Sequence, residues 1–354
     1  MASTTTTTPE AAALAQVRTG RPAVSLRFDW LMAMLSALFL AGLWVDGWAH
    51  FHSRVDDSFF TPWHLVFYGM FVVNAIVLAR TQLRGVGQGY PFARAMPFGY
   101  GLSLVSVLVF ALGGAGDMVW HELFGIESGA EALTSPTHLI LGAGMLLMFA
   151  GPLRSALGRA RAGAALTGWR ELGPAIVSVT LLLTLLMFFT SYSHPITAPV
   201  AYLNPNIPGP LDLTDFGVTS VILQAAVLTG FWAVLAARWT LPRGALTFLV
   251  MVSSGLLTIL VDVYILLPGF LIAVVLVEIV VARLKVAPDR PNAMLLVGGL
   301  LPMLHYLAYF VTMSFVTGVR WNVHVWAGAI VLAGAAGLLV VYLINAVRDQ
   351  KALS

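Results

Sequence analysis

The chain has 354 residues, a net charge of +3, only 10% charged residues and no cysteine. Its mean hydropathy of +0.87 and several apolar runs long enough to cross a bilayer exclude a soluble globular protein and predict a polytopic membrane protein. The lack of cysteine excludes disulfides and thiolate ligands, so any metal must be bound by His, Asp or Glu. The few basic residues do not indicate a nucleic-acid partner, and the expected partner is the lipid bilayer.

The apolar runs predict an all-α fold, a transmembrane helical bundle of about ten spans without a separate soluble domain. Residues 1–26 open with a threonine tract and lack apolar periodicity, so we expect a disordered cytoplasmic tail there. We divide the remainder into a metal-binding membrane half at 27–160 and a C-terminal membrane half at 161–354. The predicted spans lie near 28–49, 61–81, 97–121, 136–154, 172–192, 215–237, 243–261, 264–283, 293–315 and 322–346.

The distribution of basic residues predicts the orientation of these spans. If both termini are cytoplasmic, Arg54 and Arg320 lie on the outer side and all other Lys and Arg residues lie on the inner side. Such an excess of positive charge is typical of cytoplasmic loops. We therefore expect a multi-pass protein of the inner (plasma) membrane, with most of its histidines at the outer, periplasmic ends of the spans.

The junction between the first two predicted spans carries a candidate metal site. Asp46 and His50 are four residues apart, so they share one face of a helix. Thr61 and Pro62 form a capping residue followed by proline, which predicts a helix start and places His64 in its first turn. The two helix ends therefore aim one carboxylate and two imidazoles at a common point.

The same pattern recurs at the junction between the third and fourth predicted spans. Asp117 and His121 are again four residues apart, and Ser135-Pro136 precedes His138. An alternative interpretation is that each Asp–His pair only stabilises a helix end by hydrogen bonding. The repetition of order and spacing favours a duplicated metal site, with the ligands Asp46, His50, His64, Asp117, His121 and His138.

Five further ionisable residues lie near these sites or within the spans. His52 is interpreted as a loop residue, although it could be a third ligand if the first helix ends before it. Glu127 is a candidate hydrogen-bond acceptor for a ligating histidine, and Glu122 is a candidate general base. His305 and Glu278 lie within predicted spans, where ionisable groups normally face protein or a cavity.

The start of the second predicted span resembles a family signature. The run Asp57-Ser58-Phe59-Phe60-Thr61-Pro62-Trp63-His64 is similar to the helix entry found in the C subunit of copper membrane monooxygenases. This family includes particulate methane monooxygenase and ammonia monooxygenase. Its members carry an Asp-x3-His set before this entry and a second polar-x3-His…His set further along the chain.

The resemblance covers about residues 28–156, which is less than half of the chain. Asp117 stands where the methane enzyme usually has Asn, the loop before His138 is longer than in the family, and the last several spans have no obvious counterpart. The two sets of matching residues are Asp46, His50 and His64, followed by Asp117, His121 and His138.

The resemblance implies a copper cofactor, dioxygen and a small or apolar substrate such as an alkane or ammonia, admitted through a pocket among the spans. It also implies an assembly with further monooxygenase subunits, and a homo-oligomer is the other arrangement we consider. The ligand types alone would equally suit zinc or iron. Two other functions use the same ligands: a non-catalytic membrane protein that binds or transfers copper or zinc, and a zinc-dependent lipid hydrolase with Glu122 as base.

The two predicted sites are expected to differ in affinity. The segment between His121 and His138 is longer than that between His50 and His64, and it contains two glycines. A longer and more flexible loop costs more to order when a ligand binds. The sequence therefore predicts that the first site is filled more fully than the second.

Reporter fusions test the predicted topology. Fusions within residues 84–94 and within residues 122–131 should report opposite sides of the membrane, because one predicted span separates these loops. Fusions at both termini should report the cytoplasm, because the predicted number of spans is even. If the fusions at 84–94 and 122–131 reported the same side, the topology would be refuted.

Overall fold

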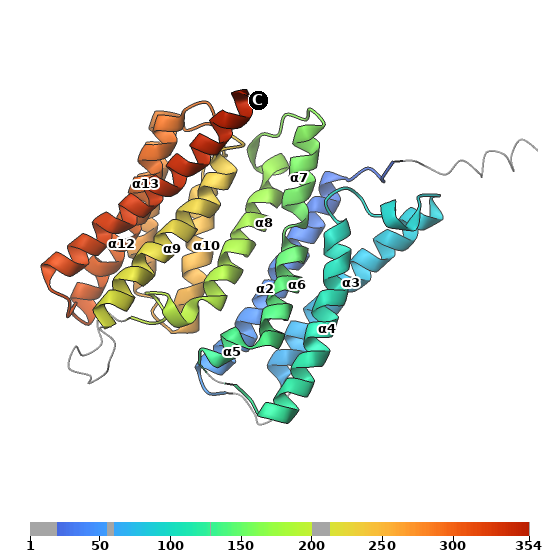
Figure 1. Ribbon diagram of the computed structural model, residues 1–354, viewed down its shortest axis with the longest axis horizontal. Coiled ribbons are helices and arrows are strands. Elements are labelled where there is room, and N and C mark those ends of the chain that lie inside the picture. The colour runs from blue at the N-terminus through green and yellow to red at the C-terminus, as the bar shows by residue number, and fades with distance from the viewer. Residues whose placement is uncertain (1–19, 55–59, 128, 200–212, 354) are drawn as a thin grey trace, which may run out of the picture.

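The computed structural model describes residues 20–54, 60–127, 129–199 and 213–353. The described residues contain helices and loops and no β-strand. Most of the expected tail at 1–26 lies outside the described residues, as does the stretch Asp57–Phe59 of the family signature. The all-α fold predicted from the sequence is confirmed, with the helices arranged side by side as a membrane bundle (Figure 1).

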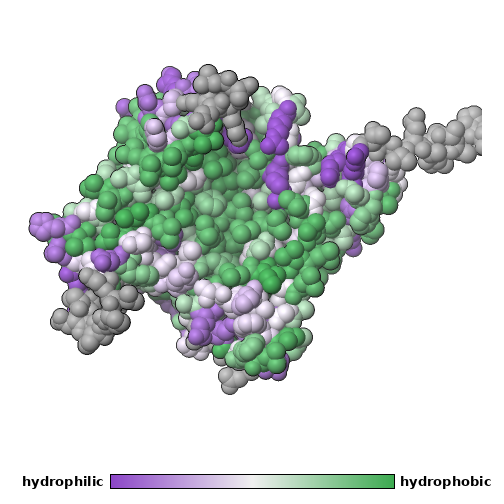
Figure 2. Space-filling view, in the orientation of Figure 1, coloured by the Kyte–Doolittle hydropathy of each residue, from purple (hydrophilic) through white to green (hydrophobic). Residues whose placement is uncertain are grey.

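Nine apolar helices of the described residues are long enough to cross a membrane. Figure 2 shows the matching surface, with hydrophobic residues across the middle of the viewed face and hydrophilic residues towards its two ends. The helices are α2 (Leu26–Phe51), α3 (Pro62–Gly87), α4 (Gly101–Phe124), α6 with α7 (Pro136–Phe149 and Gly151–Arg161), α8 (Gly168–Phe189), α9 (Leu213–Ala236), α11 (Leu266–Leu284), α12 (Pro291–Val316) and α13 (Val323–Leu353).

The predicted span at 243–261 corresponds to α10 (Ala245–Leu260), which is shorter than the others. Its 16 residues give a helix about 24 Å long, against roughly 30 Å for the hydrocarbon core of a bilayer. The remaining described helices are one-turn elements, namely α5 (Glu131–Thr134) and the 3₁₀ helices Phe92–Arg94 and Ser191–Ser193. The described part of the chain therefore has nine full-length candidate spans and a shorter apolar helix, where ten full spans were expected.

The helices alternate in direction along the chain, and α10 takes part in this alternation (Figure 1). The start of α2 and the end of α13 consequently lie at the same end of the bundle, the upper end in Figure 1. Most described Lys and Arg residues belong to segments at this upper end, whereas Arg54 and Arg320 belong to the lower end. This arrangement matches the even number of passes expected from the sequence, while the membrane side of each end stays a prediction.

Both predicted helix starts are confirmed, and the first also has a side-chain cap. The side-chain oxygen of Thr61 accepts a hydrogen bond from the backbone N–H of His64 at 3.1 Å, and Pro62 is the first residue of α3. Ser135 precedes Pro136, the first residue of α6, in the same extended conformation as Thr61. Proline suits this position because its missing N–H would have no partner in the first turn.

Glycines allow the helices of the two N-terminal hairpins to approach closely. α2 packs against α3, and α4 packs against α6. A Cβ atom on Gly42 would lie 3.0 Å from the Cα of Phe67, and one on Gly144 would lie 2.9 Å from the Cβ of Phe110. Small residues at such crossings are typical of membrane helices, which associate through close packing rather than through a hydrophobic driving force.

The N-terminal and C-terminal halves share one continuous hydrophobic core. α2 packs against α8 and α10, so the proposed boundary near residue 160 is not a gap in the packing. The indole N–H of Trp44 donates to the carbonyl of Leu256 in α10 at 2.7 Å. The ring of Phe188 in α8 occupies the space that a side chain at Gly47 would need.

A buried carboxylate near the start of α2 was not predicted from the sequence. Asp29 is fully buried and accepts hydrogen bonds from the hydroxyls of Tyr100 at 2.7 Å and Ser155 at 3.0 Å. The guanidinium of Arg159 lies 3.1 Å away and balances its charge. These contacts join α2, α4 and α7 at the upper end of the bundle.

Glu278, which the sequence marked as an ionisable residue within a span, has a structural role. Its carboxylate accepts hydrogen bonds from the backbone N–H groups of Gly244 at 2.8 Å and Thr247 at 3.0 Å. These donors belong to the first turn of α10, where backbone N–H groups have no partner within the helix. Glu278 in α11 therefore caps a neighbouring helix.

At the lower end, His52 connects the two halves. Its Nδ1 lies 2.8 Å from the carbonyl of Trp48, and its Nε2 lies 2.8 Å from a carboxylate oxygen of Asp262 in the turn after α10. The hydrogen bond to Asp262 is the main reason why the pKa of His52 is raised above 6.5. Hydrogen bonds from Tyr264 and then from His52 lower the pKa of Asp262 below 3.8.

These shifts predict that the contact stabilises the fold in a defined range of pH. The contribution of His52 is complete below pH 6.5 and declines as pH rises through its raised folded pKa. The contribution of Asp262 is complete above pH 3.8 and declines as pH falls through its lowered folded pKa. Asp262→Asn should therefore reduce the melting temperature of the detergent-solubilised protein more at about pH 5 than at about pH 8.

The exposed Asp289, at the upper end of the bundle, provides a matched control. Asp289→Asn should show a smaller difference between the two pH values. A stability loss in Asp262→Asn that is equal at both pH values would contradict the assignment of this contact.

Candidate metal centre

The first cluster lies at the lower end of the bundle, where α2 ends and α3 begins (Figure 1). Asp46 and His50 lie one turn apart near the end of α2, and His64 lies in the first turn of α3. The Nε2 atoms of His64 and His50 lie 3.4 and 4.0 Å from the two carboxylate oxygens of Asp46. One ligand atom from each residue lies within 4.8 Å of the others. The structure therefore brings together the three residues that the sequence proposed.

The carboxylate of Asp46 favours a cation in this cluster. Its side chain is 12% exposed, and its buried Oδ1 accepts no hydrogen bond from any described residue. A buried oxygen without a hydrogen bond is costly. Two ligand atoms held about 2.1 Å from one ion at tetrahedral angles lie roughly 3.4 Å apart, which is the separation of His64 Nε2 and Asp46 Oδ1. A metal ion at this point would fit the donors and complete the coordination of this oxygen.

The second cluster repeats this arrangement between α4 and α6. The Nε2 atoms of His138 and His121 lie 3.2 and 3.6 Å from the two oxygens of Asp117, and the three ligand atoms lie within 4.8 Å of one another. The side chain of Asp117 is only 2% exposed. The hydroxyl of Thr137 donates a hydrogen bond to Asp117 at 2.9 Å. The second set of proposed ligands is thus also assembled. Asp117 and His121 are more buried than Asp46 and His50, whereas His138 is more exposed than His64.

The outward-facing ring nitrogens of the second cluster have hydrogen-bond partners. Nδ1 of His121 donates to the carbonyl of Gly125 at 3.2 Å. Nδ1 of His138 lies 2.8 Å from the hydroxyl of Ser135 and 3.3 Å from the carboxylate of Glu127. A hydrogen-bond acceptor at one ring nitrogen fixes the proton there and leaves the other nitrogen free to bind a metal. Glu127 thus lies beside His138, as the sequence suggested, but its Oε2 forms no hydrogen bond with the described residues.

The inward-facing atoms of this cluster suit a positive charge between them. A proton on Nδ1 of His121, donated to the carbonyl of Gly125, leaves a lone pair on its Nε2 that faces the carboxylate of Asp117. The ring of His138 has the same tautomer when the hydroxyl of Ser135 accepts from its Nδ1. Lone pairs and a carboxylate repel one another unless a cation lies between them. The donor set of two imidazoles and one carboxylate suits a first-row transition metal. The two clusters could therefore each bind a metal ion, and the ligand types do not select which metal.

Neither His52 nor Glu122 belongs to a cluster. Both ring nitrogens of His52 face hydrogen-bond acceptors, a carbonyl and a carboxylate, so both carry protons and no lone pair remains for a metal. The side chain of Glu122 is exposed, although it follows His121 directly in the chain. The interpretation of His52 as a residue outside the metal site agrees with this geometry.

The buried histidines of the C-terminal half serve in packing and hydrogen bonding. Nδ1 of His194 accepts a hydrogen bond from the backbone N–H of Ile196 at 3.2 Å, so its proton lies on Nε2. The ring of His305 stacks on Phe270, with 4.2 Å between the ring centroids. Nε2 of His194 and Nδ1 of His305 are buried and form no hydrogen bond with the described residues.

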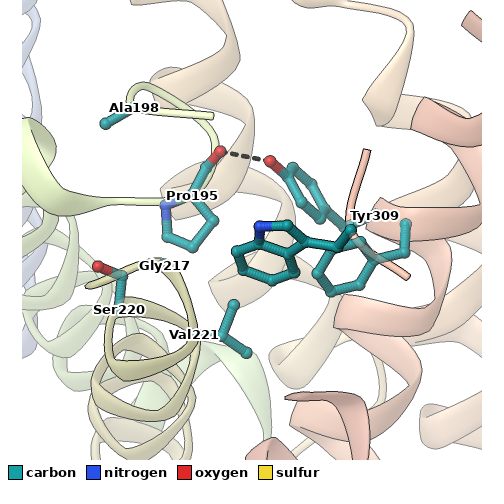
Figure 3. Close-up of a pocket in the computed structure, with 8 residues that line it drawn as sticks. Pro195, Ala198, Gly217, Ser220, Val221 and Tyr309 are labelled. Atoms are coloured by element: carbon teal, nitrogen blue, oxygen red, sulfur yellow. Dashed lines mark hydrogen bonds between the residues drawn. The ribbon is translucent and has the colours of Figure 1, made fainter. Parts of the chain in front are cut away.

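A small cavity lies near these histidines. Figure 3 shows Tyr309 donating a hydrogen bond to the carbonyl of Pro195 at its edge, with Ser220 and Val221 of α9 on the other side. The cavity has a volume of about 10 Å³, which is room for one water molecule. It is not lined by any of the six clustered Asp and His residues, so it is not the pocket expected for a substrate beside the metal.

No family model matches this chain, and no curated protein or solved structure shows significant similarity to it.

Single substitutions test the first cluster. His50→Ala and His64→Ala should each lower the metal content by about half, because losing one of three ligands empties one of two sites. His52→Ala is the matched control, and it should leave the metal content unchanged, since His52 has no free lone pair. The measurement is metal analysis of protein purified in detergent. Loss of metal in His52→Ala, with full occupancy in His64→Ala, would show that the wrong histidine has been assigned.

Local contacts favour the opposite order of affinity to that expected from loop length. Asp117 and His121 are more buried than Asp46 and His50, and hydrogen bonds reach the carboxylate and both histidine rings of the second cluster. Since such support typically changes metal affinity 10- to 100-fold, the second cluster should retain its ion longer during stepwise chelation. Anomalous scattering at each cluster after partial chelation would measure this order. Earlier loss from the second cluster would instead support the ranking by loop length.

Proposed function

We propose that this chain is a copper-dependent membrane monooxygenase, or the metal-binding subunit of one, that oxidises a small or apolar substrate of the alkane or ammonia type. The observation that carries the proposal is the pair of assembled Asp–His–His clusters at one end of a membrane bundle. The resemblance of the Asp57–His64 run and of both ligand sets to copper membrane monooxygenases supports copper over zinc or iron. The ligand geometry itself supports only a metal ion.

The residues of the chain would act by holding and orienting the metals. Three ligands from each cluster leave coordination positions open for a small molecule. A bound copper ion would supply one-electron chemistry with dioxygen. Asp46 and Asp117 would balance the charge of the ions, and Glu127 would orient His138 through its outer nitrogen. The surrounding apolar helices would limit access of bulk water to the clusters.

The proposal includes an orientation and partners. We place the chain in the plasma membrane with the clusters near the outer, periplasmic face, because the basic residues belong to the opposite end of the bundle. Electrons would come from a quinol or another carrier bound by an associated protein. Further monooxygenase subunits, or a second copy of the chain, would complete the assembly.

A non-catalytic role in binding or transferring copper or zinc is the competing proposal, because it needs the same ligands. The zinc-dependent lipid hydrolase is less favoured by the geometry. Its candidate base, Glu122, has an exposed side chain and lies outside the second cluster.

Metal identity and dioxygen use distinguish these functions. Protein purified from its native membrane should contain copper and should consume dioxygen when supplied with a quinol and a short alkane or ammonia. The double variant His50→Ala/His121→Ala should lose both properties, whereas His52→Ala should retain them. Copper without substrate-dependent dioxygen consumption in the native assembly would favour metal transfer, and zinc in both clusters would refute the monooxygenase.

A further inference from the structure

Tyr68 lies between the two clusters and contacts a ligand of each. It belongs to α3, one turn after His64, and its ring meets the ring of His64 edge to face with 5.9 Å between the centroids. Its ring also lies against Gly114 of α4, one turn before Asp117, and its hydroxyl oxygen is 3.3 Å from the position of a Cβ atom on that glycine. Asp117 is the hydrogen-bond partner of this hydroxyl. The two clusters are therefore neighbours, and Tyr68 is a side chain that connects them.

The packing around Tyr68 holds its ring in one position. A Cβ atom on Gly114, one turn before Asp117, would lie 2.8 Å from the ring, so only glycine leaves room for the phenol here. The rings of Phe67 and Phe110 pack against it, with centroids 5.3 and 5.8 Å away. Phe110 is itself buried. A ring confined in this way places its hydroxyl reproducibly at Asp117.

The hydroxyl of Tyr68 adds a hydrogen bond that helps to orient the carboxylate of Asp117. Asp117 faces His121 and His138 and also accepts a hydrogen bond from Thr137. Carboxylates that bind metals are commonly oriented by hydrogen bonds from neighbouring groups. Tyr68 supplies such a bond from α3, whereas the other partners of Asp117 belong to α4 and α6.

We propose that Tyr68 is a positioning residue shared by the two clusters: its hydroxyl orients Asp117 in the second cluster, and its ring orients His64 in the first. This inference rests on the proposed metal-binding function. It assigns separate effects to the two parts of one side chain. Removing the hydroxyl should disturb the second cluster, and removing the aromatic ring should disturb both.

Copper titration of single-cluster proteins tests this assignment. The full chain in detergent is prepared as His121→Ala, which keeps the first cluster, and as His50→Ala, which keeps the second. Each background is combined with Tyr68→Phe or Tyr68→Leu and titrated with Cu²⁺ against a competing chelator. Electron paramagnetic resonance of the bound Cu²⁺ reports the ligand geometry, which a general loss of stability would not alter in a site-specific way.

Tyr68→Phe should weaken Cu²⁺ binding to the second cluster roughly 10- to 100-fold and change its spectrum, with the first cluster nearly unaffected. Tyr68→Leu should weaken binding at both clusters. Tyr342→Phe, which alters an exposed tyrosine, is the matched control and should leave both affinities unchanged. Monodisperse elution and an unchanged melting temperature of Tyr68→Phe would establish that it folds.

The outcomes separate this inference from the proposed function. If the parent single-cluster proteins bind no Cu²⁺, the proposed metal function fails. If they bind Cu²⁺ and Tyr68→Phe binds it at the second cluster with the same affinity and spectrum, the role of the hydroxyl is overturned while the metal function stands. If Tyr68→Leu leaves the first cluster unchanged, the role of the ring is overturned.

Discussion

The burial of two carboxylates in membrane helices is the constraint on which the lower end of this protein depends. An Asp in the centre of a membrane helix costs about 2.5–3.5 kcal/mol on insertion scales, so it has to be paired or reach a polar region. Asp117 is 2% exposed, and the ion-pair partners of both Asp46 and Asp117 within the described residues are histidines. Neutral imidazoles do not balance a carboxylate, and this is the physical reason why a cation fits these clusters.

Local helix geometry brings the Asp and His side chains of each cluster together. In both hairpins, a hydroxyl residue followed by proline starts the second helix and puts a histidine at its third position, opposite an Asp–His pair at the end of the first helix. Glycines bring the paired helices close together, and Gly114 leaves the space through which Tyr68 reaches Asp117. Proline at helix starts and glycine at helix crossings, both common in membrane helices, thus determine where these side chains lie.

The two ends of the bundle stabilise buried carboxylates in different ways. Asp29 at the upper end has two hydroxyl donors and the guanidinium of Arg159, so its charge is balanced by the chain itself. At the lower end, Asp46 retains a buried oxygen without a hydrogen bond from the described residues. The charge of Asp29 is therefore balanced by a guanidinium of the chain, whereas that of Asp46 faces only imidazoles among the described residues.

The sequence by itself determined the all-α membrane fold, the starts of α3 and α6, and the two sets of Asp and His residues that lie together. Apolar length, proline position and four-residue spacing are local properties. It did not separate a full span at 243–261 from the shorter α10, since hydropathy does not show where a helix ends. Only the tertiary structure decided the roles of His52, Glu278, Asp29 and Tyr68. Their partners are 34 to 210 residues away in the chain or on a neighbouring helix, and such contacts arise from helix packing that no local pattern encodes.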